Sequence, residues 1–172
     1  GSEPIGDPAL DESRLVPALT PELQAQLPAS LLRLYVEGET LGARTRRDGP
    51  LKAHDAALVL REVAWALAYA HGQGVIHRDV KPDNILLEQA SGRALVADFG
   101  IARQIQASGM SGEGELVGTP EYMSPEQAMA EATDGRSDLY SLGVVGYYAL
   151  SGHLPFTSPT VAALLVQQVQ KV

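Results

Sequence analysis

The sequence contains no cysteine among its 172 residues. Disulfide scaffolds and cysteine-rich zinc modules are therefore excluded. The longest strongly apolar run, residues 144–150, is far shorter than the roughly 20 residues needed to span a bilayer, so no membrane segment is expected. The first residues also lack the basic-then-apolar grading of a secretory signal peptide. We expect a cytoplasmic chain, whose full-length parent could still be tethered to a membrane.

Positive charge is scarce. Lys and Arg total 13 against 21 Asp and Glu, which gives a net charge of -8 and a pI near 4.9. This balance disfavours nucleic acid as a partner, because phosphate backbones are bound by basic surfaces. The one basic cluster, Arg44, Arg46 and Arg47, is interpreted as a solvated face or loop.

The composition fits one globular domain preceded by a short lead segment. Hydrophobic residues make up 45% of the chain, enough for a single core. Residues 1–33 are interpreted as a proline-rich lead segment, a remnant or a linker, with a short helix over about 21–27. A strand is expected over 31–36, ending at Glu37 and Gly38.

Hydrophobic periodicity predicts three long helices and several short strands. Apolar residues recur at helical spacing over 53–72, and helices are also expected over roughly 137–151 and 159–171. Brief strands are expected at 75–76, 85–87 and 94–97. Residues 104–118 are rich in glycine and serine and predict a mobile loop.

Two polar segments stand out between these elements. Residues 77–84 read His-Arg-Asp-Val-Lys-Pro-Asp-Asn, and residues 98–100 read Asp-Phe-Gly. Together they resemble the catalytic loop and the metal-binding motif of protein kinases. Residues 118–126 resemble the end of a kinase activation segment, with Ser-Pro-Glu replacing the usual Ala-Pro-Glu.

The resemblance points to the bacterial serine/threonine branch of the family. Lys81 and Thr119 mark serine/threonine kinases, and segments 35–41, 68–71 and 150–156 are similar to bacterial members. The resemblance to the family covers about residues 34–172. It implies a mainly α fold with short β-hairpins, the kinase C-terminal lobe of an α+β family, truncated at both ends so that most of the N-lobe and the last helices are missing.

The resemblance also implies roles in phosphoryl transfer, with ATP and Mg²⁺ as cofactors and a protein Ser or Thr hydroxyl as acceptor. Asp79 would orient that hydroxyl and accept its proton. Lys81 would hold the negative charge of the γ-phosphate. Asn84 and Asp98 would bind Mg²⁺ through oxygen atoms.

Other residues would support this site. His77 is expected in the core below Phe99, and Gly100 would let the backbone turn. Asp138 would accept backbone hydrogen bonds near His77 and Arg78; the alternative is a plain acidic residue at a helix N-terminus.

Regulation by phosphate is a further hypothesis. Arg78, placed directly before Asp79, could clamp a phosphate bidentately. Ser108 and Ser111 are the candidate phosphosites, and two serines that are never modified remain the alternative.

Parts of the usual kinase machinery have no counterpart. The three lysines are Lys52, Lys81 and Lys171, so none before residue 52 can be the N-lobe lysine that grips the phosphates. Activity of this chain alone is therefore expected to be weak or absent.

Val36 would donate its backbone N–H to adenine. Glu126 pairs in the family with a later arginine, so here it is expected to find another partner, stay solvated or be protonated.

Two alternatives to an enzyme of this type remain. One is a non-catalytic kinase-like scaffold or docking module, which binding of Mg²⁺ and ATP would distinguish. The other is a small-molecule phosphotransferase, against which Lys81 and the 118–126 segment argue. Exposed apolar surface also makes self-association an expectation.

Overall fold

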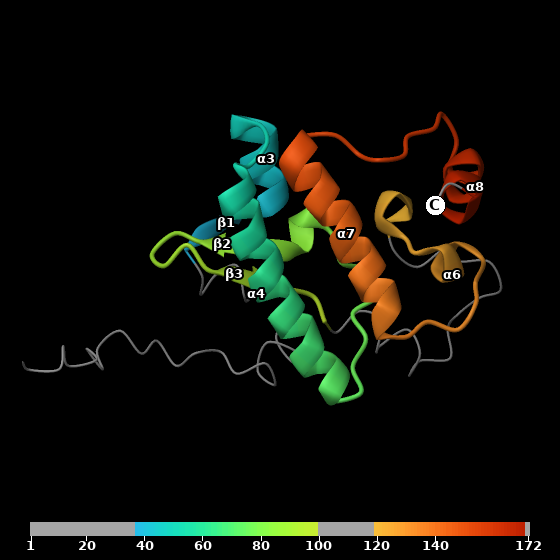
Figure 1. The fold of residues 1–172 in the computed structure, drawn as a ribbon, viewed down its shortest axis with the longest axis horizontal. Coiled ribbons are helices and arrows are strands. Elements are labelled where there is room, and N and C mark those ends of the chain that lie inside the picture. The colour runs from blue at the N-terminus through green and yellow to red at the C-terminus, as the bar shows by residue number, and fades with distance from the viewer. Residues whose placement is uncertain (1–36, 100–118, 171–172) are drawn as a thin grey trace, which may run out of the picture.

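The computed structural model describes residues 37–99 and 119–170, and the fold combines a small sheet with helices (Figure 1). The strands pair antiparallel in the order β1-β2-β3, with bounds β1 Gly38–Thr40, β2 Ile85–Glu88 and β3 Ala94–Val96. The longer helices are α3 Leu41–Asp48, α4 Ala53–Gly72, α7 Gly135–Ser151 and α8 Val161–Gln170. Single turns are η2 Pro82–Asn84, η3 Pro120–Tyr122 and α6 Pro125–Ala128.

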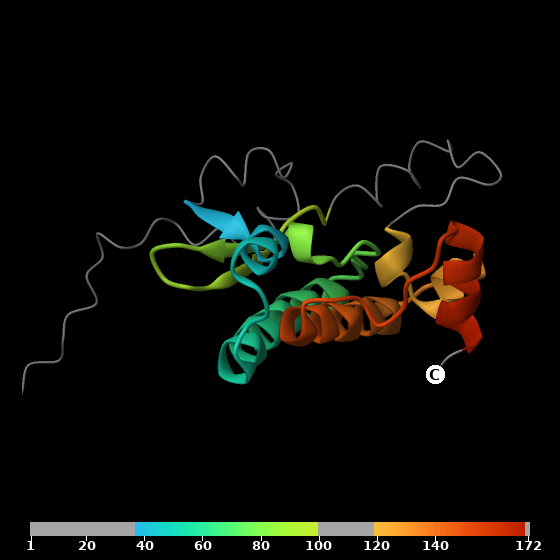
Figure 2. The same cartoon turned by 90° about the horizontal axis from the view of Figure 1, so that it is seen from above.

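Helices α4 and α7 lie side by side and antiparallel at the centre of the molecule (Figure 1). The Leu51 N–H, just before α4, donates to the Ala149 carbonyl near the end of α7, at 2.7 Å. The sheet and α3 lie together on one side of this helix pair (Figure 2). The apolar core between these layers is contiguous; it includes Leu41, Val63, Leu67, Ile85, Val96 and Val145.

The periodicity of α4 predicts its bounds correctly. Ala56, Val59, Val63 and Leu67 recur at three- and four-residue spacing and are all buried. Because this stripe faces α7 and β3, the helix is stabilised along its length by packing.

Helix α7 begins two residues before its expected start. The Asp134 side chain accepts from the Arg136 N–H at 2.8 Å and so caps the helix two residues earlier than the apolar pattern indicates. The helix ends at Gly152, which has a left-handed φ of 79°. Helix α8 and strands β2 and β3 also form where expected, to within two residues at each end.

Two local expectations were wrong. Residues 75–76 form no strand, because the Val75 N–H bonds back to the Ala70 carbonyl in the last turn of α4, at 2.9 Å. Conversely, α3 was not expected. The Thr40 hydroxyl accepts from the Ala43 N–H at 3.0 Å and starts this helix. Of its arginines, Arg46 and Arg47 are exposed, as the sequence predicts, and Arg44 is half-buried.

Several expectations concern residues outside the described ranges: the lead-segment helix at 21–27, the strand at 31–36 and the loop at 104–118. Across the described residues, no helix combines the length and the apolar character needed to cross a membrane.

Candidate functional site

The β2–β3 hairpin brings the two polar motifs together. Ile85 pairs with Val96 in the ladder, and the Ala97 N–H donates to the Asn84 carbonyl at 2.8 Å. Asn84 and Asp98 therefore lie at the same open end of the hairpin, although they are fourteen positions apart. Asp98 has a φ of 69°, a left-handed conformation that is strained for a non-glycine residue and is typical of functional sites.

The Asp79 carboxylate is the centre of a group of polar side chains. Its Oδ2 atom lies 2.7 Å from Lys81 Nζ and accepts from Asn84 Nδ2 at 3.1 Å. The Thr119 hydroxyl donates to Asp79 Oδ1 at 3.2 Å and accepts from Lys81 Nζ at 2.8 Å. Asp79, Lys81 and Thr119 thus form a closed triangle of contacts, with each side chain only partly buried.

The His77 ring lies beneath this group. It is 1% exposed, and its edge meets Phe99 with ring centroids 4.8 Å apart. His77 Nε2 contacts the Ala97 carbonyl at 2.9 Å, and Nδ1 accepts from the Asp79 N–H at 3.2 Å. Since a carbonyl can only accept, Nε2 is the donor in the contact with Ala97.

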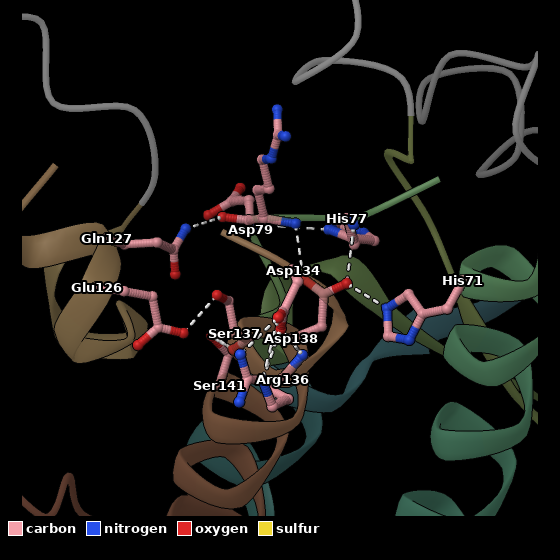
Figure 3. A network of polar contacts seen from close by, with 11 residues as sticks. His71, His77, Asp79, Glu126, Gln127, Asp134, Arg136, Ser137, Asp138 and Ser141 are labelled. Carbon is pink, nitrogen blue, oxygen red and sulfur yellow. Dashed lines mark hydrogen bonds and ion pairs between the residues drawn. The ribbon is translucent and has the colours of Figure 1, made fainter. Parts of the chain in front are cut away.

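The fully buried Asp138 carboxylate holds the backbone before Asp79 (Figure 3). Asp138 Oδ2 accepts from the His77 N–H at 2.9 Å, and Oδ1 accepts from the Arg78 N–H at 2.8 Å. These are the backbone contacts that the sequence led us to expect. Arg78 has a φ of 67°, so the carboxylate stabilises a strained turn of the loop.

His71 joins the same carboxylate and was not among the candidate residues. Its Nε2 atom lies 2.7 Å from Asp138 Oδ2, and Figure 3 shows it reaching across from α4. A Cβ atom on Gly135 would lie 2.6 Å from His71 Nδ1. Only glycine at the start of α7 leaves room for the His71 ring. The spacing of residues along the sequence could not reveal this contact.

Glu126 has a side-chain partner within the described residues. Ser137 donates to its carboxylate at 2.5 Å. Burial raises the pKa of Glu126, but hydrogen bonds from Ser137, the Glu126 backbone and Ser124 outweigh burial and hold this pKa below its ordinary value. For Glu126 the sequence left open another partner, a solvated carboxylate or protonation. The structure shows another partner, and the lowered pKa disfavours protonation.

The order of these motifs along the chain is matched by known proteins. A family described as the protein kinase domain matches residues 23–172. The chain belongs to the protein kinase family. This membership agrees with the mainly α fold and its small antiparallel sheet.

Relatives of this kinase chain include curated bacterial proteins. Serine/threonine-protein kinase PknL of Mycobacterium tuberculosis (strain CDC 1551 / Oshkosh) is 42% identical over 139 residues, 81% of this chain and 35% of that protein. Serine/threonine-protein kinase Pkn1 of Myxococcus xanthus is 45% identical over 140 residues, which are 79% of this chain and 20% of that protein. Serine/threonine-protein kinase PknB of Mycobacterium tuberculosis (strain ATCC 25177 / H37Ra) is 40% identical over 154 residues, which are 86% of this chain and 24% of that protein. The chain spans about a third or less of the length of these kinases.

The expected metal ligands of the kinase fit a magnesium ion. Asn84 is 5% exposed and directs its amide nitrogen at the Asp79 carbonyl and carboxylate, at 2.9 and 3.1 Å. The amide oxygen is then the atom that could coordinate a cation, together with the Asp98 carboxylate. Mg²⁺ prefers oxygen ligands and commonly uses one or two carboxylates plus phosphates. In the part of the kinase that the structure describes, no three His, Asp or Glu side chains cluster as a metal cage.

A recess of about 480 Å³ lies between β1, α3 and the end of the catalytic loop. Leu86 and Thr40 line it, and the ion pair between Arg46 and Asp83, at 2.8 Å, forms part of its wall. Composition did not single out these residues, because β1 and the loop are about forty positions apart. Val36, the expected adenine contact, is two residues before β1 in the sequence and lies outside the described residues, as do Gly100, Ser108 and Ser111.

The Arg78 side chain has one notable atom. Its Nε is buried and makes no hydrogen bond within the described residues, while its backbone carbonyl accepts from Gln127 Nε2 at 2.8 Å. A buried donor of this kind suits an anionic partner. Phosphate capture by Arg78 nevertheless stays a prediction.

Proposed function

We propose that this chain carries the catalytic residues of a serine/threonine protein kinase that transfers the γ-phosphoryl group of ATP to a protein Ser or Thr hydroxyl. The observation that supports this most directly is the Asp79 carboxylate, which is contacted by Lys81, Asn84 and Thr119 at 2.7 to 3.2 Å. The serine/threonine names of the relatives agree with it.

In this proposal Asp79 positions the acceptor hydroxyl and takes its proton. Its Oδ1 atom is bonded to Thr119 alone among these side chains, at 3.2 Å, a long contact that an incoming hydroxyl could replace. Oδ2 stays bonded to Asn84 and Lys81, which keeps the carboxylate oriented. The ammonium of Lys81 would then counter the charge of the phosphate in transfer.

Asn84 and Asp98 would hold Mg²⁺, which supplies positive charge against the phosphate oxygens when bound. The nucleotide base and ribose would lie in the recess beside Leu86. Because the site has no N-lobe lysine before residue 52, we expect turnover by this chain to be weak or absent.

Calorimetric titration of the full chain with ATP, with and without Mg²⁺, tests the proposal. We expect binding that requires Mg²⁺ and weakens at least tenfold in Asp98→Asn, because one of two protein ligands loses its charge. Asp134→Asn is the matched control, since Asp134 is an exposed helix cap. Binding indifferent to Mg²⁺ and to Asp98→Asn would instead support the non-catalytic scaffold. If the chain phosphorylates a basic protein and Asp79→Asn abolishes that activity, the result would support the transferase and refute our expectation of weak or absent turnover.

A further inference from the structure

Gln168 of α8 is a buried polar side chain that the site described above does not include. It is 1% exposed and makes three side-chain hydrogen bonds. Tyr140 of α7 donates its hydroxyl to Gln168 Oε1 at 2.6 Å. Gln168 Nε2 donates to the carbonyls of Pro120 and Glu121 at 3.4 and 3.0 Å.

The orientation of this amide is dictated by its neighbours. The two carbonyls can only accept, so they require the NH₂ end, and Tyr140 then bonds to the oxygen end. Burial raises the pKa of Tyr140, as does the nearby Glu126 charge, which keeps the hydroxyl a donor. A buried amide costs free energy unless it is fully hydrogen-bonded, and here every partner is specific to one end of the group.

The bonds from Gln168 complete a row of side-chain donors along η3. The carbonyls of Pro120, Glu121 and Tyr122 are consecutive, and all three accept from side chains of the helices. Gln168 serves the first two, and the Ser141 hydroxyl of α7 serves the third, at 2.7 Å. The backbone of η3 is therefore held from two helices at once.

Thr119 lies directly before this held segment. Its own carbonyl accepts from the Tyr122 N–H at 2.9 Å, and the next residue is Pro120, whose ring restricts the backbone. A shift of the Pro120 carbonyl would therefore move the Thr119 hydroxyl, which joins Asp79 to Lys81 at 3.2 and 2.8 Å.

We propose that Gln168 is a positioning residue for phosphoryl transfer: it fixes residues 120–122 and thereby places the Thr119 hydroxyl between Asp79 and Lys81. This inference rests on the proposed function. It assigns to α8 a part in setting the geometry of the active site, although Gln168 contacts none of the reacting groups.

Nuclear magnetic resonance of the Lys81 ammonium in the full chain tests this without requiring catalysis. The three lysines make its signal simple to assign, and exposed Lys52 is an internal reference. Gln168→Glu keeps the shape but removes both donors and faces two carbonyls with a carboxylate. We expect exchange of the Lys81 ammonium protons with water to rise about tenfold, because the bond to Thr119 is lost.

Gln167→Glu is the matched control, with the same charge change one position away. Within the described residues, Gln167 donates to the exposed Thr157 carbonyl, at 3.3 Å, and not to η3, so Lys81 exchange should not change. Should Gln168→Glu unfold the chain, Tyr140→Phe removes a single hydrogen bond and should raise the Lys81 rate in the same direction by a smaller factor.

Faster exchange of the Tyr122 and Met123 amides with no change at Lys81 would overturn the inference, because Gln168 would then stabilise η3 only. A change at Lys81 in a chain that fails to bind Mg²⁺ and ATP would support the coupling while the proposed function fails. The two hypotheses can therefore be told apart.

Discussion

Asp138 and Glu126 are two carboxylates that are hydrogen-bonded within the fold in different ways. Asp138 is fully buried and accepts hydrogen bonds from two backbone amides and one imidazole. Glu126 is only half-buried and relies on Ser137 and on nearby backbone. The first arrangement shapes the catalytic loop, and the second links α6 to the start of α7.

The lowered pKa of Glu126 predicts a pH-dependent contribution to stability. Because the pKa of Glu126 is lower in the folded chain than in the unfolded one, the contribution is present above the ordinary glutamate pKa of 4.5 and is lost as the pH falls through the folded pKa. Glu126→Gln should lower the free energy of unfolding at pH 7, and the difference from wild type should shrink below about pH 4. Urea denaturation at several pH values measures this. A difference that is constant with pH would contradict it.

The C-terminal end of α4 lies beside the N-terminal end of α7 where His71 contacts Asp138. The last turn of α4 contains His71, and the first turn of α7 contains Asp138. A basic group at a helix C-terminus and an acidic one at an N-terminus each interact favourably with the helix dipole. The close approach of the two ends depends on Gly135.

Gly135→Ala should destabilise the chain by about 1–3 kcal/mol, because the new methyl group would overlap the His71 ring and must displace it. Gly143→Ala, on the same helix, has nothing within 4 Å of the added atom and should stabilise by about 0.5–1 kcal/mol. Thermal and urea unfolding of both variants checks this pair. Equal effects of the two substitutions would show that His71 is not confined as described.

The molecule as a whole is organised around α7. Its residues bond to α4 through Asp138, to the catalytic loop through the same carboxylate, and to η3 through Ser141. Leu139, Tyr147 and Leu150 remain 45% to 52% exposed on its outer face. Self-association through such surface stays a prediction.

Asp138→Asn should therefore weaken several parts of the fold at once. An amide nitrogen cannot accept, so at least one of the three donors loses its partner, and the expected loss is at least about 2 kcal/mol. Asp134→Asn should change the free energy of unfolding much less than Asp138→Asn, since asparagine is an equally good cap and the ion pair with Arg136 is exposed. Chemical denaturation compares the two, and similar losses would argue against Asp138 as the central acceptor.

Much of the site could be predicted because its residues are close in sequence. Asp79, Lys81 and Asn84 lie within one loop, and a single hairpin adds Asp98. Helix α4 could be predicted equally well, since its buried residues recur every three to four positions. The start of α3 was missed because its signal is one cap, Thr40, with no long apolar stripe behind it.

The polar motifs along the chain were enough to indicate the family by resemblance and to select Asp79, Lys81, Asn84 and Asp98 as candidate site residues, because these motifs are local in sequence. Which side chains support them was decided only by folding. His71 is 67 positions from Asp138, and Gln168 is 48 positions from Pro120. Such pairs leave no periodic trace in the sequence, since each depends on how whole helices pack and on where a glycine leaves room.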